Sequence, residues 1–195
     1  NDVAAASSAY FEVLEIDNVS ADAVAGLEEL VASGRVPKDE LAPVMTRLLP
    51  YYELAEKHDR WARALETLAE VAETPTERRQ HLELLTDLCS GPLNDLPAAF
   101  RAALRIFELE PADGANRSRL VDLAKKANLL PDAVASFRRV LADTSDAALR
   151  RDLLVLVAEL EEQQPGRKTE AERAWREILK IDPLHVGAFK ALTRI

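Results

Sequence analysis

Residues 170–183, with the sequence EAERAWREILKIDP, have the residue spacing of an amphipathic helix that ends before a proline. Their apolar members Ala171, Ala174, Trp175, Ile178 and Leu179 lie at positions i, i+3, i+4, i+7 and i+8, along one side of a helix. Similar spacing recurs in four other stretches, which are residues 6–14, 61–69, 99–107 and 133–141. The pattern therefore predicts five helices that each bury one apolar side.

These stretches belong to a repeat in which longer and shorter intervals alternate. Four of them begin, in chain order, at Trp61, Ala99, Ala133 and Ala171. A second series alternates with the first, and each member is predicted to open another helix: Leu48, Leu82, Leu120, Leu154 and Leu192. In both series the spacing repeats after every second interval. We call this double interval the period; it runs, for example, from Leu48 to Leu120 and from Ala99 to Ala171. A fixed repeat of this size predicts stacked two-helix units.

The predicted fold is all-α: an α–α superhelix, a right-handed solenoid of antiparallel helix pairs with about eleven helices. No stretch alternates apolar and polar residues as a half-buried strand does, so we expect no sheet. Residues 1–195 are predicted to form a single solenoid, with degenerate helices over 1–37 and repeats over 38–195. The chain begins without a methionine and ends without a polar capping helix, so we expect it to be a segment of a longer array.

One region leaves two alternatives open. Pro43 and Pro50 lie within residues 38–57, and a proline inside a helix removes a hydrogen bond and clashes with the preceding turn. Pro50 is therefore expected to kink or end a helix. The segment forms either one kinked helix or two short ones.

The repeats resemble the tetratricopeptide repeat, a 34-residue unit of two antiparallel helices. Residues 131–143, PDAVASFRRVLAD, and residues 170–183 are similar to its second helix, with a small residue followed four positions later by a large apolar one. The resemblance covers nearly all of the chain from residue 42 on, and residues 6–33 less closely. The small residue usual in the first helix is replaced by Leu49, Glu83, Val121 and Val155. The stretch AERAWREIL is also similar to the half-a-TPR repeat, although the 34-residue spacing favours the former family.

The resemblance implies a non-enzymatic scaffold for protein–protein interactions, because tetratricopeptide repeats line a concave surface with their first helices. Carried over by register, the partner-binding residues are Glu53, Gln80, Leu84, Asp87, Ser118, Asp122, Lys125, Asp152, Leu156 and Glu159. With Glu77, Lys190 and Arg194, this lining holds six acids and three bases, which makes the groove mildly acidic. We expect a basic or amphipathic peptide there, or a partner helix seated on Leu84, Leu149 and Leu156. The competing interpretation is that these acids are only the solvated side of helices.

The carboxylate-clamp subfamily needs Lys and Asn at set positions of the first helices. Those positions hold Thr46, Pro50, Gln80, Leu84, Ser118 and Asp122. We therefore do not expect this chain to belong to the carboxylate-clamp subfamily. The alternative function is a helical accessory or spacer domain of a larger enzyme or envelope-assembly protein.

Composition narrows the classes of partner. The net charge of −9 argues against nucleic acid and against an anionic membrane surface, since both are bound mainly through Lys and Arg. No apolar run is long enough to cross a bilayer. Cys89 is the only cysteine, so no internal disulfide can form. A cytoplasmic location is expected, with a periplasmic or envelope-associated one as the alternative.

Catalytic patterns are absent from the sequence. His58, His81 and His185 are far apart and lack the spacing of metal ligands, and no glycine-rich phosphate loop occurs. We therefore expect no catalytic, cofactor-binding or metal-binding residues. Two arginine pairs, at 78–79 and 150–151, recur one period apart. Such exposed pairs can bind phosphate, but we expect them instead to form salt bridges between repeats.

Overall fold

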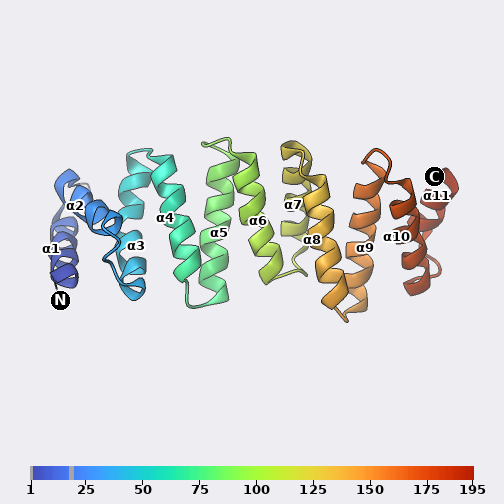
Figure 1. Cartoon of the computed structure of the whole chain (residues 1–195), viewed down its shortest axis with the longest axis horizontal. Helices are drawn as coiled ribbons and strands as arrows, with labels where there is room; N and C mark the ends of the chain where they lie inside the picture. Colours follow the sequence, from blue (N-terminus) through green and yellow to red (C-terminus); the bar gives the residue numbers. More distant parts are fainter. Residues whose placement is uncertain (1, 18–19) are drawn as a thin grey trace. The chain divides into compact units, whose positions relative to one another are not determined.

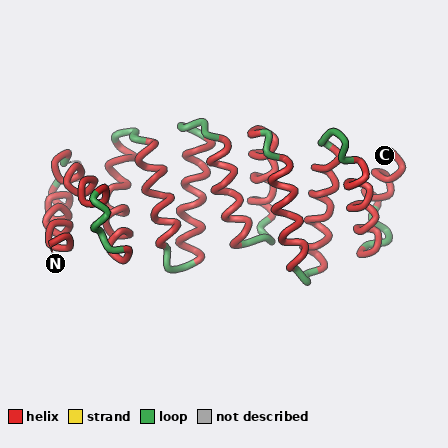
Figure 2. The backbone as a smooth tube through the Cα atoms, viewed as in Figure 1, coloured by secondary structure: helices red, strands yellow, loops and turns green. Residues whose placement is uncertain are grey.

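The computed structural model describes residues 2–17 and 20–195, and every regular element in them is a helix (Figures 1 and 2). Part of the expected N-terminal segment 1–37, namely residues 1, 18 and 19, lies outside the described residues. The helices are α1 (Asp2–Ile16), α2 (Ala21–Ala32), α3 (Lys38–Leu54), α4 (His58–Val71), α5 (Pro75–Ser90), α6 (Leu96–Leu109), α7 (Gly114–Ala127), α8 (Leu130–Asp143), α9 (Ala147–Glu162), α10 (Lys168–Ile181) and α11 (Val186–Arg194). The prediction of an all-α chain with about eleven helices is confirmed.

The chain divides into two compact units, residues 1–102 and residues 103–195. We call them the N-terminal unit and the C-terminal unit. The boundary falls inside α6. The expectation of a single solenoid over 1–195 stays a prediction.

The period found in the sequence is present in the helix boundaries themselves. Helices α8, α9 and α10 each begin and end one full period after α4, α5 and α6, and α11 begins one period after α7. Trp61, Ala99, Ala133 and Ala171 each occupy the fourth position of their helix. The prediction that the leucine series opens helices is wrong. Each helix begins earlier, and these leucines lie at its seventh or eighth position: Leu82, Leu120, Leu154 and Leu192.

Capping side chains explain why these helices begin earlier than the leucines suggest. The Thr74 hydroxyl accepts a hydrogen bond from the Glu77 backbone N–H, and the Glu77 carboxylate accepts one from the Thr74 N–H. The Asp113 and Asp146 carboxylates accept backbone N–H groups at the starts of α7 and α9. Each satisfies donors that the first turn of a helix leaves unpaired.

The recurring arginines cap the ends of the preceding helices. Arg78 donates from Nε to the Ala69 carbonyl at 3.1 Å, and Arg150 donates from Nη1 to the Leu141 carbonyl at 2.8 Å. These two bonds are equivalent, because donor and acceptor are both displaced by one period. A cation at the carbonyl end of a helix is favourable on electrostatic grounds. The expected salt bridges between repeats are therefore replaced, at these two positions, by bonds to the backbone of α4 and α8.

Residues 38–54 form one helix that contains both prolines. Pro43 and Pro50 cannot donate backbone hydrogen bonds, yet α3 continues to Leu54. Val44, Leu48 and Tyr52 lie at i, i+4 and i+8 and are all buried, so packing against neighbouring helices offsets the missing bonds. Of the two alternatives, the segment therefore forms one helix rather than two short ones, and Pro50 does not end it.

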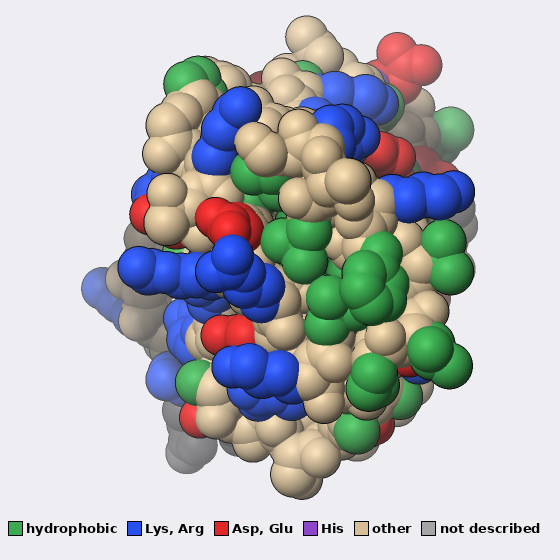
Figure 3. All heavy atoms as spheres, turned by 90° about the vertical axis from the view of Figure 1, so that its right-hand side faces the viewer, with side chains coloured by type: hydrophobic (Ala, Val, Ile, Leu, Met, Phe, Trp, Pro, Cys, Tyr) green, Lys and Arg blue, Asp and Glu red, His purple; other side chains and the backbone are tan. Residues whose placement is uncertain are grey.

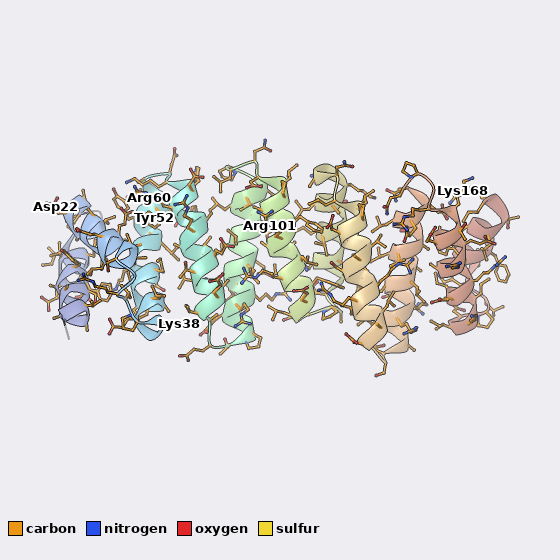
Figure 4. All side chains as sticks on the ribbon, viewed as in Figure 1. Asp22, Lys38, Tyr52, Arg60, Arg101 and Lys168 are labelled. Carbon is orange, nitrogen blue, oxygen red and sulfur yellow. The ribbon has the colours of Figure 1, made fainter. Side chains whose placement is uncertain are left out.

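A polar cluster ties α2, α3 and α4 together within the N-terminal unit. The Tyr52 hydroxyl donates to Glu28 Oε1 at 2.9 Å, and the Arg60 guanidinium pairs with the same carboxylate. Figure 4 labels Tyr52 and Arg60 close together on α3 and α4. Burial and the bond to Glu28 both raise the pKa of the Tyr52 hydroxyl above its usual range, which keeps it protonated.

Aromatic side chains fill the core in both units, as predicted for the two tryptophans. Phe107 and Phe137 meet edge to face in the C-terminal unit, with ring centroids 5.1 Å apart. Trp175 is buried and its Nε1 donates to Glu162. Trp61 is partly buried against the apolar core of the N-terminal unit.

Candidate functional site

An open cavity of about 550 Å³ lies in the C-terminal unit, on the side formed by first helices. It is bounded by α7, by α9 and by the turn between α10 and α11. Its lining residues are Gly114, Arg117, Ser118, Arg151, Asp152, Val155, Leu156, Asp182 and His185. Three of the ten residues predicted from register, Ser118, Asp152 and Leu156, are thus brought together.

Asp152 sits between two guanidinium groups. Its Oδ2 lies 3.4 Å from Arg117 Nη2, and its Oδ1 lies 3.2 Å from Arg151 Nη2. Arg117 also donates from Nη1 to the Pro111 carbonyl at 2.8 Å, and only 13% of its side chain is exposed. Arg117 is therefore held in place, whereas Asp152 and Arg151 remain about two-fifths exposed and can still reach a ligand.

The turn before α11 supplies the third side of the cavity. Asp182 Oδ1 accepts a hydrogen bond from the Leu184 N–H at 3.2 Å. His185 Nδ1 accepts one from the Ala188 N–H at 3.0 Å, so this imidazole caps α11 with its Nδ1 unprotonated. Both side chains line the cavity while they also fix the turn.

Apolar and ionic groups alternate along the α9 side of the cavity. Val155 and Leu156 are half-buried and follow the Arg151–Asp152 pair after one turn of helix. The ionic groups in the lining are two arginines and two aspartates, so this cavity carries no excess acidic charge. The mildly acidic character expected for the groove does not extend to this cavity.

The other seven predicted residues are exposed and lie outside this cavity. Asp122 and Lys125 are on α7, and Glu159 is on α9, all in the C-terminal unit. The remaining four belong to the N-terminal unit, and they are Glu53 on α3 and Gln80, Leu84 and Asp87 on α5. Gln80, Leu84 and Asp87 share one face of α5, and Leu84 is 47% exposed between its two polar neighbours.

The net negative charge of the chain comes from the N-terminal unit. Residues 1–102 contain 9 of the 25 basic residues and 19 of the 34 acidic ones. The C-terminal unit therefore has nearly equal numbers of both signs. An acidic binding surface is consequently expected on the N-terminal unit, where Glu53 and Asp87 lie.

The prediction from first-helix positions did not include the other residues that line the cavity. Arg117 and Arg151 precede the predicted Ser118 and Asp152 by one position, and their side chains still reach the cavity. Asp182 and His185 come from a turn that a register of first helices does not include. The recurrence of Arg151 and the position of Asp182 before a proline were the available signals.

Apolar side chains are also exposed at α11. Figure 3 looks onto this end of the C-terminal unit, where hydrophobic and basic side chains form separate groups. The exposed apolar residues include Leu184, Val186 and Phe189.

Two titratable groups with shifted pKa values lie on α5, where His81 is half-buried and Cys89 is buried. Burial lowers the pKa of His81, and the nearby Glu77 carboxylate partly opposes that shift. Burial raises the pKa of the Cys89 thiol, and the Asp95 carboxylate adds to the effect. Over residues 2–17 and 20–195, no group of three or more His, Cys, Asp or Glu residues is placed to hold a metal ion. No described helix is long and apolar enough to cross a membrane.

Comparison with known proteins gives structural neighbours only. No family model and no curated protein matches the sequence. Among solved structures, YrrB, described as a TPR protein with an unusual peptide-binding site, aligns at 14% identity over 97% of this chain and 100% of its own, with a TM-score of 0.43. The Naa15/Naa10 complex bound to HypK-THB aligns at 14% identity over 93% of this chain and 32% of that one, with a TM-score of 0.49.

A tetratricopeptide repeat protein from Parabacteroides merdae ATCC 43184 aligns at 16% identity over 96% of this chain and 67% of that one, with a TM-score of 0.36. This chain spans about a third of the matched Naa15/Naa10 chain. The described helices form pairs with alternating shorter and longer units, as the sequence predicted.

Proposed function

We propose that this chain is a non-enzymatic scaffold that binds a protein or peptide partner on the exposed side of its first helices. The observation that supports this function most directly is the cavity between α7, α9 and the turn before α11. It is open, it contains half-buried Val155 and Leu156, and its polar groups are held by their own contacts. Apolar surface with a few oriented polar groups is typical of ligand sites.

The chemistry of the cavity favours an amphipathic segment. Arg151 can donate to backbone carbonyls of a peptide, and Asp152 can accept from its N–H groups. An apolar side chain of the peptide would cover Leu156 and remove its exposed surface from water. Because arginine and aspartate charges balance here, a strongly basic segment gains no net attraction from the lining of this cavity.

The N-terminal unit suits a basic stretch of the same or another partner. Leu84 offers exposed apolar surface on α5 between Gln80 and Asp87, and the unit as a whole has a large excess of acidic residues. Complementary charge speeds association and selects among partners. We therefore expect partners in which a basic segment accompanies an amphipathic one.

A random-peptide display library selected against residues 1–195 would test this function. Enriched peptides would then be titrated calorimetrically against the wild type and Leu156→Ser. We expect Leu156→Ser to weaken binding about tenfold, because the transfer of a leucine side chain out of water is lost. Leu184→Ser is the matched control, since Leu184 is 83% exposed and lies outside the cavity lining.

Two outcomes would contradict the proposal. The first is a selection that enriches no peptide, which would favour a spacer role. The second is a set of enriched peptides whose affinity falls as much with Leu184→Ser as with Leu156→Ser.

A further inference from the structure

A second cavity, of about 320 Å³, lies among α8, α9 and α10 in the C-terminal unit. None of its lining residues belongs to the cavity described above. The side chains that carry charge here are Arg138 on α8, Glu161 on α9, Arg167 before α10, and Glu170 and Arg173 on α10. Three guanidinium groups, one from α8 and two from α10 and its N-cap, thus face two carboxylates, which leaves one positive charge in excess.

Glu161 is the unusual member of this group. It is only 3% exposed, and its Oε1 accepts a hydrogen bond from Arg138 Nη2 at 3.0 Å. Its Oε2 is buried and has no hydrogen-bond partner, because Arg167 Nε stays 3.7 Å away. A buried acceptor without a donor costs free energy, and a ligand that donates to it would recover that cost.

The guanidinium groups keep donors for a ligand as well. Arg167 contacts Glu161 and Glu170 at 3.7 and 3.6 Å, which are ion-pair distances rather than hydrogen bonds. Arg173 is exposed and has no ion-pair or hydrogen-bond partner among residues 2–17 and 20–195. The need to pair the buried Glu161 therefore explains why Arg138 is present in this cavity, and it partly explains Arg167. It does not explain why Arg173 is there.

At the equivalent place one period earlier, two of the three arginines are replaced by acidic residues. Glu161, Arg138, Arg167 and Arg173 correspond there to Cys89, Glu66, Asp95 and Arg101, in the same order. Asp95, Arg101 and Glu66 all act electrostatically on the Cys89 thiol. The same fold therefore accommodates this position without an arginine cluster. The cluster around Glu161 is not a requirement of the helix packing.

We propose that the Arg138–Arg167–Arg173 cavity binds a phosphate group that carries a proton, either free or as a phosphomonoester. Arginine donors from α8 and from the N-terminal part of α10 match the oxygens of a tetrahedral oxyanion. Glu161 Oε2 accepts the hydrogen bond of the P–OH group. Sulfate has the same shape and no proton at neutral pH, so the buried carboxylate repels it. Glu161 thus selects phosphate over sulfate, and this site does not depend on the peptide-binding role of the first helices.

The test is an NMR titration of the arginine Nε–H signals of residues 1–195 with inorganic phosphate, O-phosphoserine and sulfate at constant ionic strength. We expect phosphate to bind at least about tenfold more tightly than sulfate, and Arg173→Gln to weaken phosphate binding about tenfold. Tighter binding of O-phosphoserine than of phosphate would identify an ester as the ligand; the reverse would identify free phosphate. Arg101→Gln on α6 (Figure 4) is the matched control and should change nothing.

Glu161→Gln tests the selectivity. The amide donates to either oxyanion, so the ratio of phosphate to sulfate affinity should fall towards one. If Glu161→Gln does not fold, the response to Arg173→Gln still decides. Equal affinity of the wild type for phosphate and sulfate would overturn the proposal, and so would equal losses from Arg173→Gln and Arg101→Gln.

Discussion

Glu161 occupies the fifteenth position of α9, and Cys89 occupies the fifteenth position of α5, one period earlier. Both are buried, at 3% exposure each. The position holds a thiol in one period and a carboxyl group in the next. Arg138, which pairs with Glu161, is replaced one period earlier by Glu66. The period therefore conserves helix boundaries, while two of the three charged residues around one buried position change sign, from Glu66 to Arg138 and from Asp95 to Arg167.

Cys89→Glu should destabilise the chain by about 3 kcal/mol or more, because the new carboxylate would be buried beside Glu66 and Asp95 without an arginine in place of Arg138. The measurement is urea-induced unfolding followed by circular dichroism. Cys89→Ala is the control and should cost about 1 kcal/mol, as a small cavity does. Equal midpoints for the two variants would show that the surroundings of Cys89 tolerate a charge.

Arg78 and Arg150 make equivalent bonds, so their removal should have similar effects. Arg78→Met and Arg150→Met should each lower the free energy of unfolding by about 1–2 kcal/mol, since each loses a charged hydrogen bond to a helix end. Urea unfolding of both variants checks this. Arg63→Met, an exposed position on α4, should change stability by less than about 0.5 kcal/mol. A cost at Arg63 as large as that at Arg78 would contradict a specific capping role.

His81 should make stability depend on pH. Its pKa is lowered by burial in the folded chain, so below about pH 6.5 the unfolded chain binds more protons than the folded one. Stability should therefore fall as the pH drops from 7.5 through 6.5, and should level off once the pH is below the folded pKa. Tm would be measured between pH 7.5 and 5 for the wild type and His81→Gln. The difference between the two proteins should change with pH, and a constant difference would exclude His81 as the source.

The sequence predicted the helices well because their buried residues recur at helical spacing. Val44, Leu48 and Tyr52 carried enough apolar surface to keep α3 intact through Pro50, and a local rule about proline does not include that packing. Part of the cavity lining could also be predicted from the sequence, because some of its residues recur at fixed positions of the first helices. Ser118, Asp152 and Leu156 follow the register of first helices, but the reach of Arg117 and the turn before α11 depend on tertiary contacts.

Asp122 and Asp152 were predicted together as acidic groove residues, and only Asp152 lines the cavity. Asp152 lies in the cavity lining between Arg117 and Arg151, whereas Asp122 is exposed outside it. Asp152→Lys would place three cations side by side and remove the acceptor that orients Arg151. We expect it to weaken binding of a selected amphipathic peptide about tenfold or more, with Asp122→Lys changing affinity less than about twofold. Calorimetric titration of both single variants and the double variant would measure this. The double variant should have the same peptide affinity as Asp152→Lys alone, because only one of the two carboxylates lines the cavity. A larger loss of affinity in Asp122→Lys than in Asp152→Lys would instead place the partner across the exposed face of α7.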